Sequence, residues 1–334
     1  MVKMMSELDY NKVLEPKKNE ASVKSEDIGS FKEIFTKEAK NRMQVSSELV
    51  SAIASDTNSA NSCTVVGNSE VEYVESENLK DVEDVESTMK NLISGLNSKD
   101  WIIVCESLNN VRRLSLFHKE SLQDMLKDVL PLIVKSLKNP RSGVCKTAIM
   151  ASADLFTTFK DTIIDSMDPL LMQLLLKASQ DKKFVCEAAD RTLIQLTRSV
   201  SPLLLLPILH PYLQNKNPRI RARAALCFSR SVPRLDDEGI QSYGINKLIQ
   251  VAASQLSDQL PESREAARTL LLNLQTMYEE SNGVAADSNL NSWEQFCNIN
   301  LSPLNAQAVL RVTNVARQAL ILGSKCECHS VSTA

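Results

Sequence analysis

The sequence predicts an all-α solenoid, in which short helix pairs stack side by side along the chain. A short motif that begins with valine and cysteine recurs about every forty residues, at Val104, Val144 and Val185. The apolar positions that follow each copy have a helical period. In addition, only 8 of the 334 residues are glycine, which argues against β-rich and glycine-loop architectures.

Each copy of the motif begins the inner helix of a repeat. Aligned copies place Val104, Val144, Val185, Ile220 and Ser263 at the first position. Residues four, seven and eleven positions later lie on one face of a helix. The first of these offsets carries Ala148, Ala189, Ala224 and Ala267 in the last four copies. We therefore expect a narrow, alanine-rich face that packs closely.

An apolar outer helix is expected before the inner helix in four of the repeats. These segments begin at Leu122, Met167, Ser201 and Gly244. A helix pair of this length cannot bury its apolar face alone but can do so against its neighbours. The pattern is typical of HEAT or armadillo solenoids and predicts about six helix pairs over residues 88–323.

Three cysteines, Cys105, Cys145 and Cys186, occupy one position in successive repeats. Stacked helices lie about 8–10 Å apart, whereas a disulfide needs Cα atoms within roughly 7 Å. We interpret these cysteines as small, reduced residues of the packed interior. Reduced thiols agree with a cytoplasmic protein.

The two ends of the chain differ from its repeats. Residues 1–87 carry 10 Lys and Arg against 18 Asp and Glu, whereas the remaining residues carry 28 against 23. This composition predicts a disordered acidic N-terminal arm, in which a short helix through Ile28, Phe31, Phe35 and Met43 could bind a further protein partner. Residues 281–293 are expected to form a link, Ser302 and Pro303 to begin a capping helix, and Gly323 to end it before a flexible tail at 324–334.

Several function classes lack support in the sequence. The first residues contain no apolar signal core, and the most apolar run, near Leu203, is short and interrupted by prolines, so no membrane association is expected. The three histidines are scattered, and no phosphate-binding loop or nucleophile elbow is present, which predicts a protein without catalytic residues or cofactor. The sequence CECH at 326–329 lacks the fourth ligand that zinc normally takes, so no metal site is expected.

The turns between outer and inner helices are the strongest candidate for a functional surface. Equivalent turns of a solenoid lie along one edge, because each repeat places its loops beside those of the next. This edge would carry Lys99, Arg141, Lys182, Lys183, Lys216, Arg219, Arg221 and Arg264. Trp101 opens the first inner helix and has two readings: an exposed anchor for a partner, or a side chain that folds back to cap the first repeat.

These turns also carry a family resemblance. Trp101 in the first turn, NPRSGVCKTA in the second, DKKFVCEAADRTL in the third and NKNPRIRARAA in the fourth resemble a TOG domain, and are most similar to those of the crescerin and CLASP proteins. The resemblance covers about 88–280, with a sixth helix pair to about 323.

The resemblance implies a microtubule-associated protein of the cytoplasm and cytoskeleton that binds αβ-tubulin or microtubules through the turns. By position, the implied contacts are Trp101 in the first turn; Arg141, Val144 and Lys146 in the second; Lys182 and Lys183 in the third; Lys216, Asn217, Arg219 and Arg221 in the fourth; and Arg264 in the fifth. Glu262 beside Arg264 departs from the basic pattern.

The charge pattern agrees with such a partner, because tubulin is acidic and a row of cations can steer and orient it. Nucleic acid fits less well, since the body is only slightly basic and no row of aromatic residues accompanies the cations. The alternative is a generic HEAT or armadillo adaptor that binds a protein or peptide on its concave face.

Overall fold

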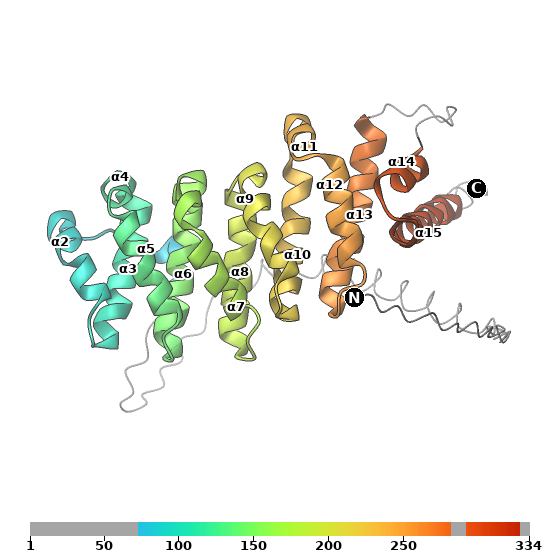
Figure 1. The fold of residues 1–334 in the computed structure, drawn as a ribbon. Coiled ribbons are helices and arrows are strands. Elements are labelled where there is room, and N and C mark those ends of the chain that lie inside the picture. Colours follow the sequence, from blue (N-terminus) through green and yellow to red (C-terminus); the bar gives the residue numbers. More distant parts are fainter. Residues whose placement is uncertain (1–72, 282–291, 328–334) are drawn as a thin grey trace, which may run out of the picture. The chain divides into compact units, whose positions relative to one another are not determined.

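The computed structural model describes residues 73–281 and 292–327, with side chains described as far as Val315. All of these residues belong to one compact unit, Ser69–Ala334. Its helices stand side by side in the order of the sequence, from α2 at one end to α15 at the other (Figure 1). The predicted all-α solenoid is confirmed.

Six helix pairs build the stack within the described residues, and each has an outer and an inner helix. The pairs are α2 (Val85–Leu96) with α3 (Trp101–Phe117), α5 (Leu126–Leu137) with α6 (Ser142–Phe159), α7 (Asp168–Lys177) with α8 (Lys183–Ser199), α9 (Pro202–Leu209) with α10 (Pro218–Ser231), α12 (Ile245–Gln255) with α13 (Pro261–Ser281), and α14 (Trp293–Asn300) with α15 (Pro303–Glu327). Short helices join them: η1 (Ser76–Asn78), α4 (Lys119–Gln123), η2 (Lys160–Ser166), η3 (His210–Gln214), η4 (Val232–Arg234) and α11 (Asp237–Tyr243).

The core lies between inner and outer helices and between successive inner helices. Val144, Ala148, Ala151 and Leu155 of α6 are all fully buried, as the register of the repeat predicts. Alanine at this face allows α3, α6 and α8 to approach closely, because a larger side chain would push the helix axes apart. The register of the inner helices therefore follows directly from the repeat.

The C-terminal part differs from the sequence prediction in two respects. The helix α15 begins at Pro303, after Ser302, as expected, but it continues past Gly323 to Glu327. The predicted tail at 324–334 therefore starts too early, and residues 328–334, which include part of CECH, lie outside the described residues. Leu304, in the first turn of this helix, is 76% exposed.

The buried face of α15 carries Ala306, Val309 and Thr313 instead. Thr313 accepts a hydrogen bond from the indole of Trp293 in α14, with 3.2 Å between Nε1 and Oγ1. The helix α14 begins at Trp293, where the expected link ends, and it is the outer helix of the sixth pair. The bond joins α14 to the buried face of α15.

The N-terminal boundary also lies earlier than predicted. Residues 73–84, here called the N-terminal strap, were assigned to the arm, yet Leu79 is buried. Ser76 donates a 2.6 Å hydrogen bond to Asp154 of α6, and Arg112 of α3 forms a buried ion pair with the same carboxylate at 2.7 Å. The helix α2 starts at Val85. The folded unit thus includes the strap, while residues 1–72 lie outside the described residues.

Candidate functional site

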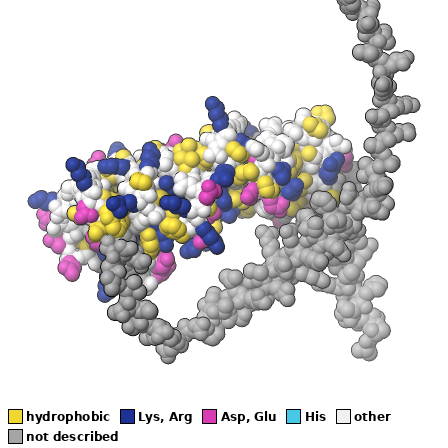
Figure 2. Space-filling model, turned by 90° about the horizontal axis from the view of Figure 1, so that it is seen from below, with side chains coloured by type: hydrophobic (Ala, Val, Ile, Leu, Met, Phe, Trp, Pro, Cys, Tyr) yellow, Lys and Arg dark blue, Asp and Glu magenta, His cyan; other side chains and the backbone are white. Residues whose placement is uncertain are grey.

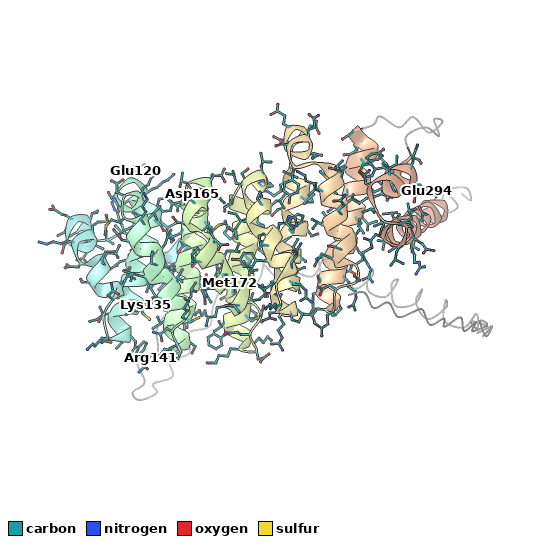
Figure 3. All side chains as sticks on the ribbon, in the orientation of Figure 1. Glu120, Lys135, Arg141, Asp165, Met172 and Glu294 are labelled. Carbon is teal, nitrogen blue, oxygen red and sulfur yellow. The ribbon has the colours of Figure 1, made fainter. Side chains whose placement is uncertain are left out.

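The five turns between outer and inner helices lie along one edge of the stack. Figure 3 shows Arg141 at this edge, whereas Glu120 and Asp165 lie at the opposite one. The term turn edge is used below for residues 97–101, 138–144, 180–185, 215–221 and 258–264. Seen from this side, Lys and Arg side chains recur along the length of the unit, with hydrophobic and acidic side chains between them (Figure 2).

Four of the turns have the same local structure. A side-chain oxygen accepts a hydrogen bond from the backbone N–H two residues later, which closes a tight turn. The pairs are Ser98 with Asp100 at 3.0 Å, Asn139 with Arg141 at 2.9 Å, Asn215 with Asn217 at 2.9 Å, and Asp258 with Leu260 at 3.1 Å. These bonds hold the start of each inner helix in the same orientation.

Asn217, one of the predicted contacts, has a structural role in this arrangement. Its side chain caps α10 by accepting a 3.0 Å hydrogen bond from the backbone N–H of Arg219. Asp100 caps α3 in the same manner, at 2.9 Å from the N–H of Ile102. The Asn217 side chain therefore provides an acceptor for a backbone N–H at the start of α10 that has no partner within the helix.

From the second repeat to the fifth, the residue after the first motif residue joins the inner helix to the turn or outer helix before it. Cys145 donates from Sγ to the carbonyl of Leu137, and Cys186 does the same to Ala178, at 3.4 and 3.0 Å. Burial raises the pKa of the Cys145 thiol, so it stays protonated and able to donate. The thiols are thus more than apolar filling, because they satisfy carbonyls at outer-helix ends.

Arginine takes the place of cysteine at this position in the fourth and fifth repeats. Arg221 donates to the carbonyl of Asn215 at 2.9 Å, and its Nε lies 2.6 Å from an Asp258 carboxylate oxygen. Arg264 donates to the carbonyls of Asp258 and Gln259 at 2.7 and 2.9 Å. Both predicted contact residues are therefore engaged within the turns, and Arg221 links the fourth turn to the fifth.

Two further candidates do not lie free on the turn edge. Val144 is fully buried and packs in the core, so the structure contradicts its assignment as a surface contact. Lys146 points onto the N-terminal strap, with its ammonium 3.8 Å from the ring centroid of Tyr73. The sequence NPRSGVCKTA does not show which of its residues face the core, so neither position could be predicted from it.

Arg219 bridges the third and fourth turns but stays half exposed. Its guanidinium donates to the carbonyl of Ser179 and to the Asp181 carboxylate, both at 3.1 Å. The side chain is 56% exposed and retains donors for a partner. Arg219 thus fixes the spacing of two turns and contributes charge.

The exposed cations concentrate at the second, third and fourth turns. Arg141, Lys182, Lys183 and Lys216 are exposed. Nζ of Lys183 lies 3.8 Å from a Glu187 carboxylate oxygen, which is a long distance for an ion pair. An open groove of about 520 Å³ separates the second turn from the third. Lys138 and Lys177 line this groove with Lys182 and Arg219, while Cys145 and Val185 are also part of its wall. The sequence prediction missed Lys138 and Lys177, which end the preceding outer helices.

Trp101 is neither fully exposed nor fully buried. The indole is partly buried against the core, and the guanidinium carbon of Arg141 lies 5.3 Å from its ring centroid. A cation at this distance stacks favourably on the ring. The pair joins the first turn to the second and keeps part of both side chains at the surface. Phe184 of the third turn, which the sequence analysis passed over, is 44% exposed.

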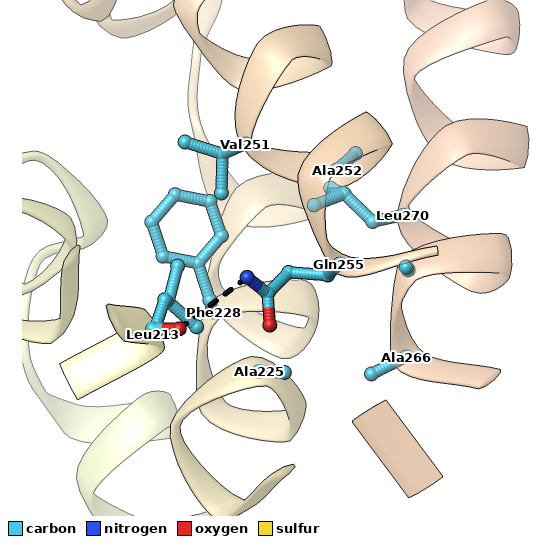
Figure 4. Close-up of a pocket in the computed structure, with 9 residues that line it drawn as sticks. Leu213, Ala225, Phe228, Val251, Ala252, Gln255, Ala266 and Leu270 are labelled. Atoms are coloured by element: carbon cyan, nitrogen blue, oxygen red, sulfur yellow. Dashed lines mark hydrogen bonds between the residues drawn. The ribbon is translucent and has the colours of Figure 1, made fainter. Parts of the chain in front are cut away.

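Candidate metal ligands do not cluster in the described part of the chain. No group of three or more His, Cys, Asp and Glu residues there could hold a metal ion. An enclosed cavity of about 10 Å³ lies beside Phe228 and Gln255, where Gln255 donates to the carbonyl of Leu213 at 3.4 Å (Figure 4). That volume barely admits one water molecule. None of the helices in these ranges is long and apolar enough to cross a membrane.

Known proteins share this architecture. The chain is 29% identical over 180 residues, 53% of its length, to TOG array regulator of axonemal microtubules protein 1 of Mus musculus, and 35% identical over 107 residues, 32% of its length, to the Homo sapiens protein of that name. The matched regions span 10% and 6% of those relatives. A solved structure from work on microtubule plus-end tracking by XMAP215, CLIP-170 and EB1 aligns with a TM-score of 0.51 and 20% identity, over 71% of this chain and 95% of that one.

The family assignment rests on a match longer than these pairwise alignments. Residues 86–293, from the second residue of α2 to the first of α14, match the family described as the CLASP N-terminal domain. This range covers the first five helix pairs and all five turns. The fold, the repeat register and this match, which spans more than half of the chain, agree with one another: the protein belongs to the CLASP N-terminal family, and the resemblance to TOG domains of the crescerin and CLASP type is confirmed.

Proposed function

We propose that residues 73–327 bind αβ-tubulin through the turn edge and that the protein regulates microtubule dynamics or organisation without catalysing a reaction. The observation that supports this most directly is that the five turns lie along one edge, which carries exposed cations at the second, third and fourth turns. The curated relatives are named as regulators of axonemal microtubules, which favours the microtubule cytoskeleton of the cytoplasm as the place of action.

The contacts divide into an anchor and a charged surface. Trp101 with Arg141 supplies a partly exposed aromatic and cation pair at the first two turns. Lys182, Lys183 and Lys216 supply charges that complement an acidic partner, and Lys138 and Lys177 extend this surface into the groove. Arg221, Arg264 and Asn217 hold the turns in place and act indirectly. The generic adaptor remains the competing reading.

Charge reversal on the turn edge tests the proposal. The full chain and a K182E/K183E/K216E variant would be run with unpolymerised tubulin in size-exclusion chromatography and with stabilised microtubules in pelleting assays. The variant should lose most binding, because three exposed cations become anions against an acidic partner, and raising salt should weaken the wild-type complex.

A matched variant controls for net charge. Lys119, Lys127 and Lys247 are exposed at α4, α5 and the start of α12, away from the turn edge. K119E/K127E/K247E changes net charge equally and should leave binding within about threefold of wild type. A folded wild-type chain that binds neither form of tubulin at low salt, or equal losses in both variants, would favour the adaptor.

A further inference from the structure

Four arginines gather on the inner helices of the third and fourth repeats, away from the turn edge. Arg191 and Arg198 lie seven residues apart on α8, and Arg223 and Arg230 lie seven residues apart on α10. A spacing of seven is nearly two helical turns, so each pair shares one helix face. The name inner-face arginine cluster is used below for these four residues.

Contacts between the two helices bring the pairs together. Arg223 of α10 forms an ion pair with Asp190 of α8, with 3.1 Å between Nη1 and Oδ1. Burial raises the pKa of Asp190, and the charges of Arg223 and Arg230 lower it, which places both guanidinium groups near this carboxylate. The faces of α8 and α10 that carry the cluster therefore lie side by side, as the ribbon also shows (Figure 1).

Most of the positive charge in the cluster is uncompensated. Arg191, Arg198 and Arg230 are exposed, and within residues 73–281 and 292–315 they form no hydrogen bond or ion pair. Glu187, one turn before Arg191, lies 3.8 Å from Lys183 instead. Among the described residues, Asp190 is thus the one carboxylate that forms an ion pair with a member of the cluster. Exposed guanidinium groups with free donors suit bidentate binding of carboxylates.

The inner helices of the first two repeats already bind an acidic segment of the same chain, which includes the short helix η1. The N-terminal strap contains Glu75, Glu77, Asp81, Glu83 and Asp84 and packs against α3 and α6. Its contact residues recur every third position: Tyr73 on Lys146, Ser76 on Asp154 and Arg112, and buried Leu79. In register, Arg230 of α10 stands where α6 carries Asp154, since each follows the first motif residue by ten positions.

We propose that the inner-face arginine cluster is a second protein-binding surface, which takes an extended acidic segment of a partner protein alongside α8 and α10. Seven residues of helix rise about 10.5 Å, and three residues of a polyproline II chain, which complete one turn, span about 9.3 Å. Acidic side chains at every third position of such a segment therefore share one face and meet both arginines of a helix.

An acidic polypeptide fits this surface better than nucleic acid. The guanidinium group of arginine binds both carboxylates and phosphates, but the binding of single-stranded nucleic acid also depends on aromatic side chains that stack on bases. The neighbouring apolar residues, Ile194 and Leu226, are aliphatic and half-buried. The strap is also a direct example of a peptide bound to the inner helices.

Peptide binding to the full chain tests the proposal. The probe is a fluorescently labelled twelve-residue peptide with glutamate at every third position and serine elsewhere, measured by anisotropy at low salt. R191E/R198E/R230E should weaken binding at least about tenfold, while K182E/K183E/K216E on the turn edge should change it less than about threefold. A peptide of equal composition with contiguous glutamates should bind more weakly to wild type.

Three outcomes would overturn the proposal: no binding by the wild-type chain, equal losses in the two variants, or tighter binding of a twelve-nucleotide oligouridine through the same arginines. If the triple variant loses its cooperative unfolding transition, R191E/R198E carries the test, since both side chains are exposed on one helix, and it should weaken binding about threefold or more. Tubulin pelleting separates this proposal from the function above: the inner-face variant should keep tubulin binding, which the turn-edge variant loses.

Discussion

Several side chains of this protein form hydrogen bonds with backbone groups at helix ends and in turns, which leaves them less free to contact a partner. Cys145 and Arg264 occupy equivalent positions, and each donates to a carbonyl of the preceding turn or outer helix. A thiol and a guanidinium differ in size and charge, but both supply a donor to carbonyls of the outer-helix end or the turn, which lack helical partners. Residue type alone therefore does not tell a binding cation from a structural one along this edge.

The pair of Trp101 and Arg141 gives a first prediction at this scale. Trp101→Ala removes a partly buried ring and its cation stack, so we expect the free energy of unfolding to fall by about 1–2 kcal/mol and tubulin binding to weaken severalfold. Urea denaturation and microtubule pelleting measure the two effects. Trp101→Phe should restore most of the stability but only part of the binding; unchanged binding by the alanine variant would remove Trp101 from the contact surface.

The buried ion pair of Arg112 and Asp154 gives a second prediction. Arg112 is fully buried, and its Nε lies 2.7 Å from the Asp154 carboxylate. Arg112→Met should lower the free energy of unfolding by about 3–5 kcal/mol, because it leaves a buried carboxylate without its cation. The double variant R112M/D154L should recover most of that loss in urea denaturation. A double variant as unstable as the single one would show that the pair itself contributes the stability.

At the scale of the element, small residues decide how closely the helices approach. Gly95 of α2 faces Ser107 of α3, and a Cβ built at Gly95 would lie 2.2 Å from the Ser107 hydroxyl oxygen. Ser107 donates this hydroxyl to the carbonyl of Ile103 at 2.8 Å, so it is held in place. This contact matters for the first helix pair, because within the described residues no earlier repeat packs against α2.

Gly95→Ala should therefore lower the unfolding midpoint. Overpacking lowers the free energy of unfolding by about 1–3 kcal/mol, and the higher helix propensity of alanine offsets about 1 kcal/mol of this loss. The double variant G95A/S107A removes the hydroxyl oxygen and should return the midpoint to wild type or above. Thermal and urea denaturation of the three proteins provide the comparison. A stabilised single variant would mean that α2 and α3 are packed less closely than the structure indicates.

At the scale of the whole molecule, the N-terminal strap joins two repeats that lie forty residues apart in sequence. Its serine completes the site formed by Arg112 and Asp154, and Leu79 adds buried apolar surface. A chain that begins at residue 73 should unfold at the same urea concentration as the full chain. A chain that begins at Val85 should lose about 2 kcal/mol or more, since it loses one buried leucine and the hydrogen bonds of Ser76. Equal midpoints for the two truncated chains would contradict a structural role for the strap.

Local sequence was sufficient to determine the helix pairs and the inner-helix register. The periodic positions of Val144, Ala148, Ala151 and Leu155 select one helix face, and burial of that face is the same physical event in every repeat. The turns were also recognisable, because Asn, Asp and Ser close them through bonds within two residues. The single edge of turns follows from repetition alone.

Only the tertiary structure decided which residues on that edge are free, where the folded unit begins and how α15 is rotated. Val144, Arg221 and Arg264 stand at positions for which the family resemblance implies contacts. Their roles are determined by the burial of Val144, by bonds of the two arginines to carbonyls six residues earlier, and by the ion pair of Arg221 with Asp258. The strap has the composition of a disordered arm and folds because α3 and α6 supply Arg112 and Asp154 from elsewhere in the chain. Sequence patterns report short-range geometry, whereas these outcomes depend on pairs of groups that meet only when the repeats stack.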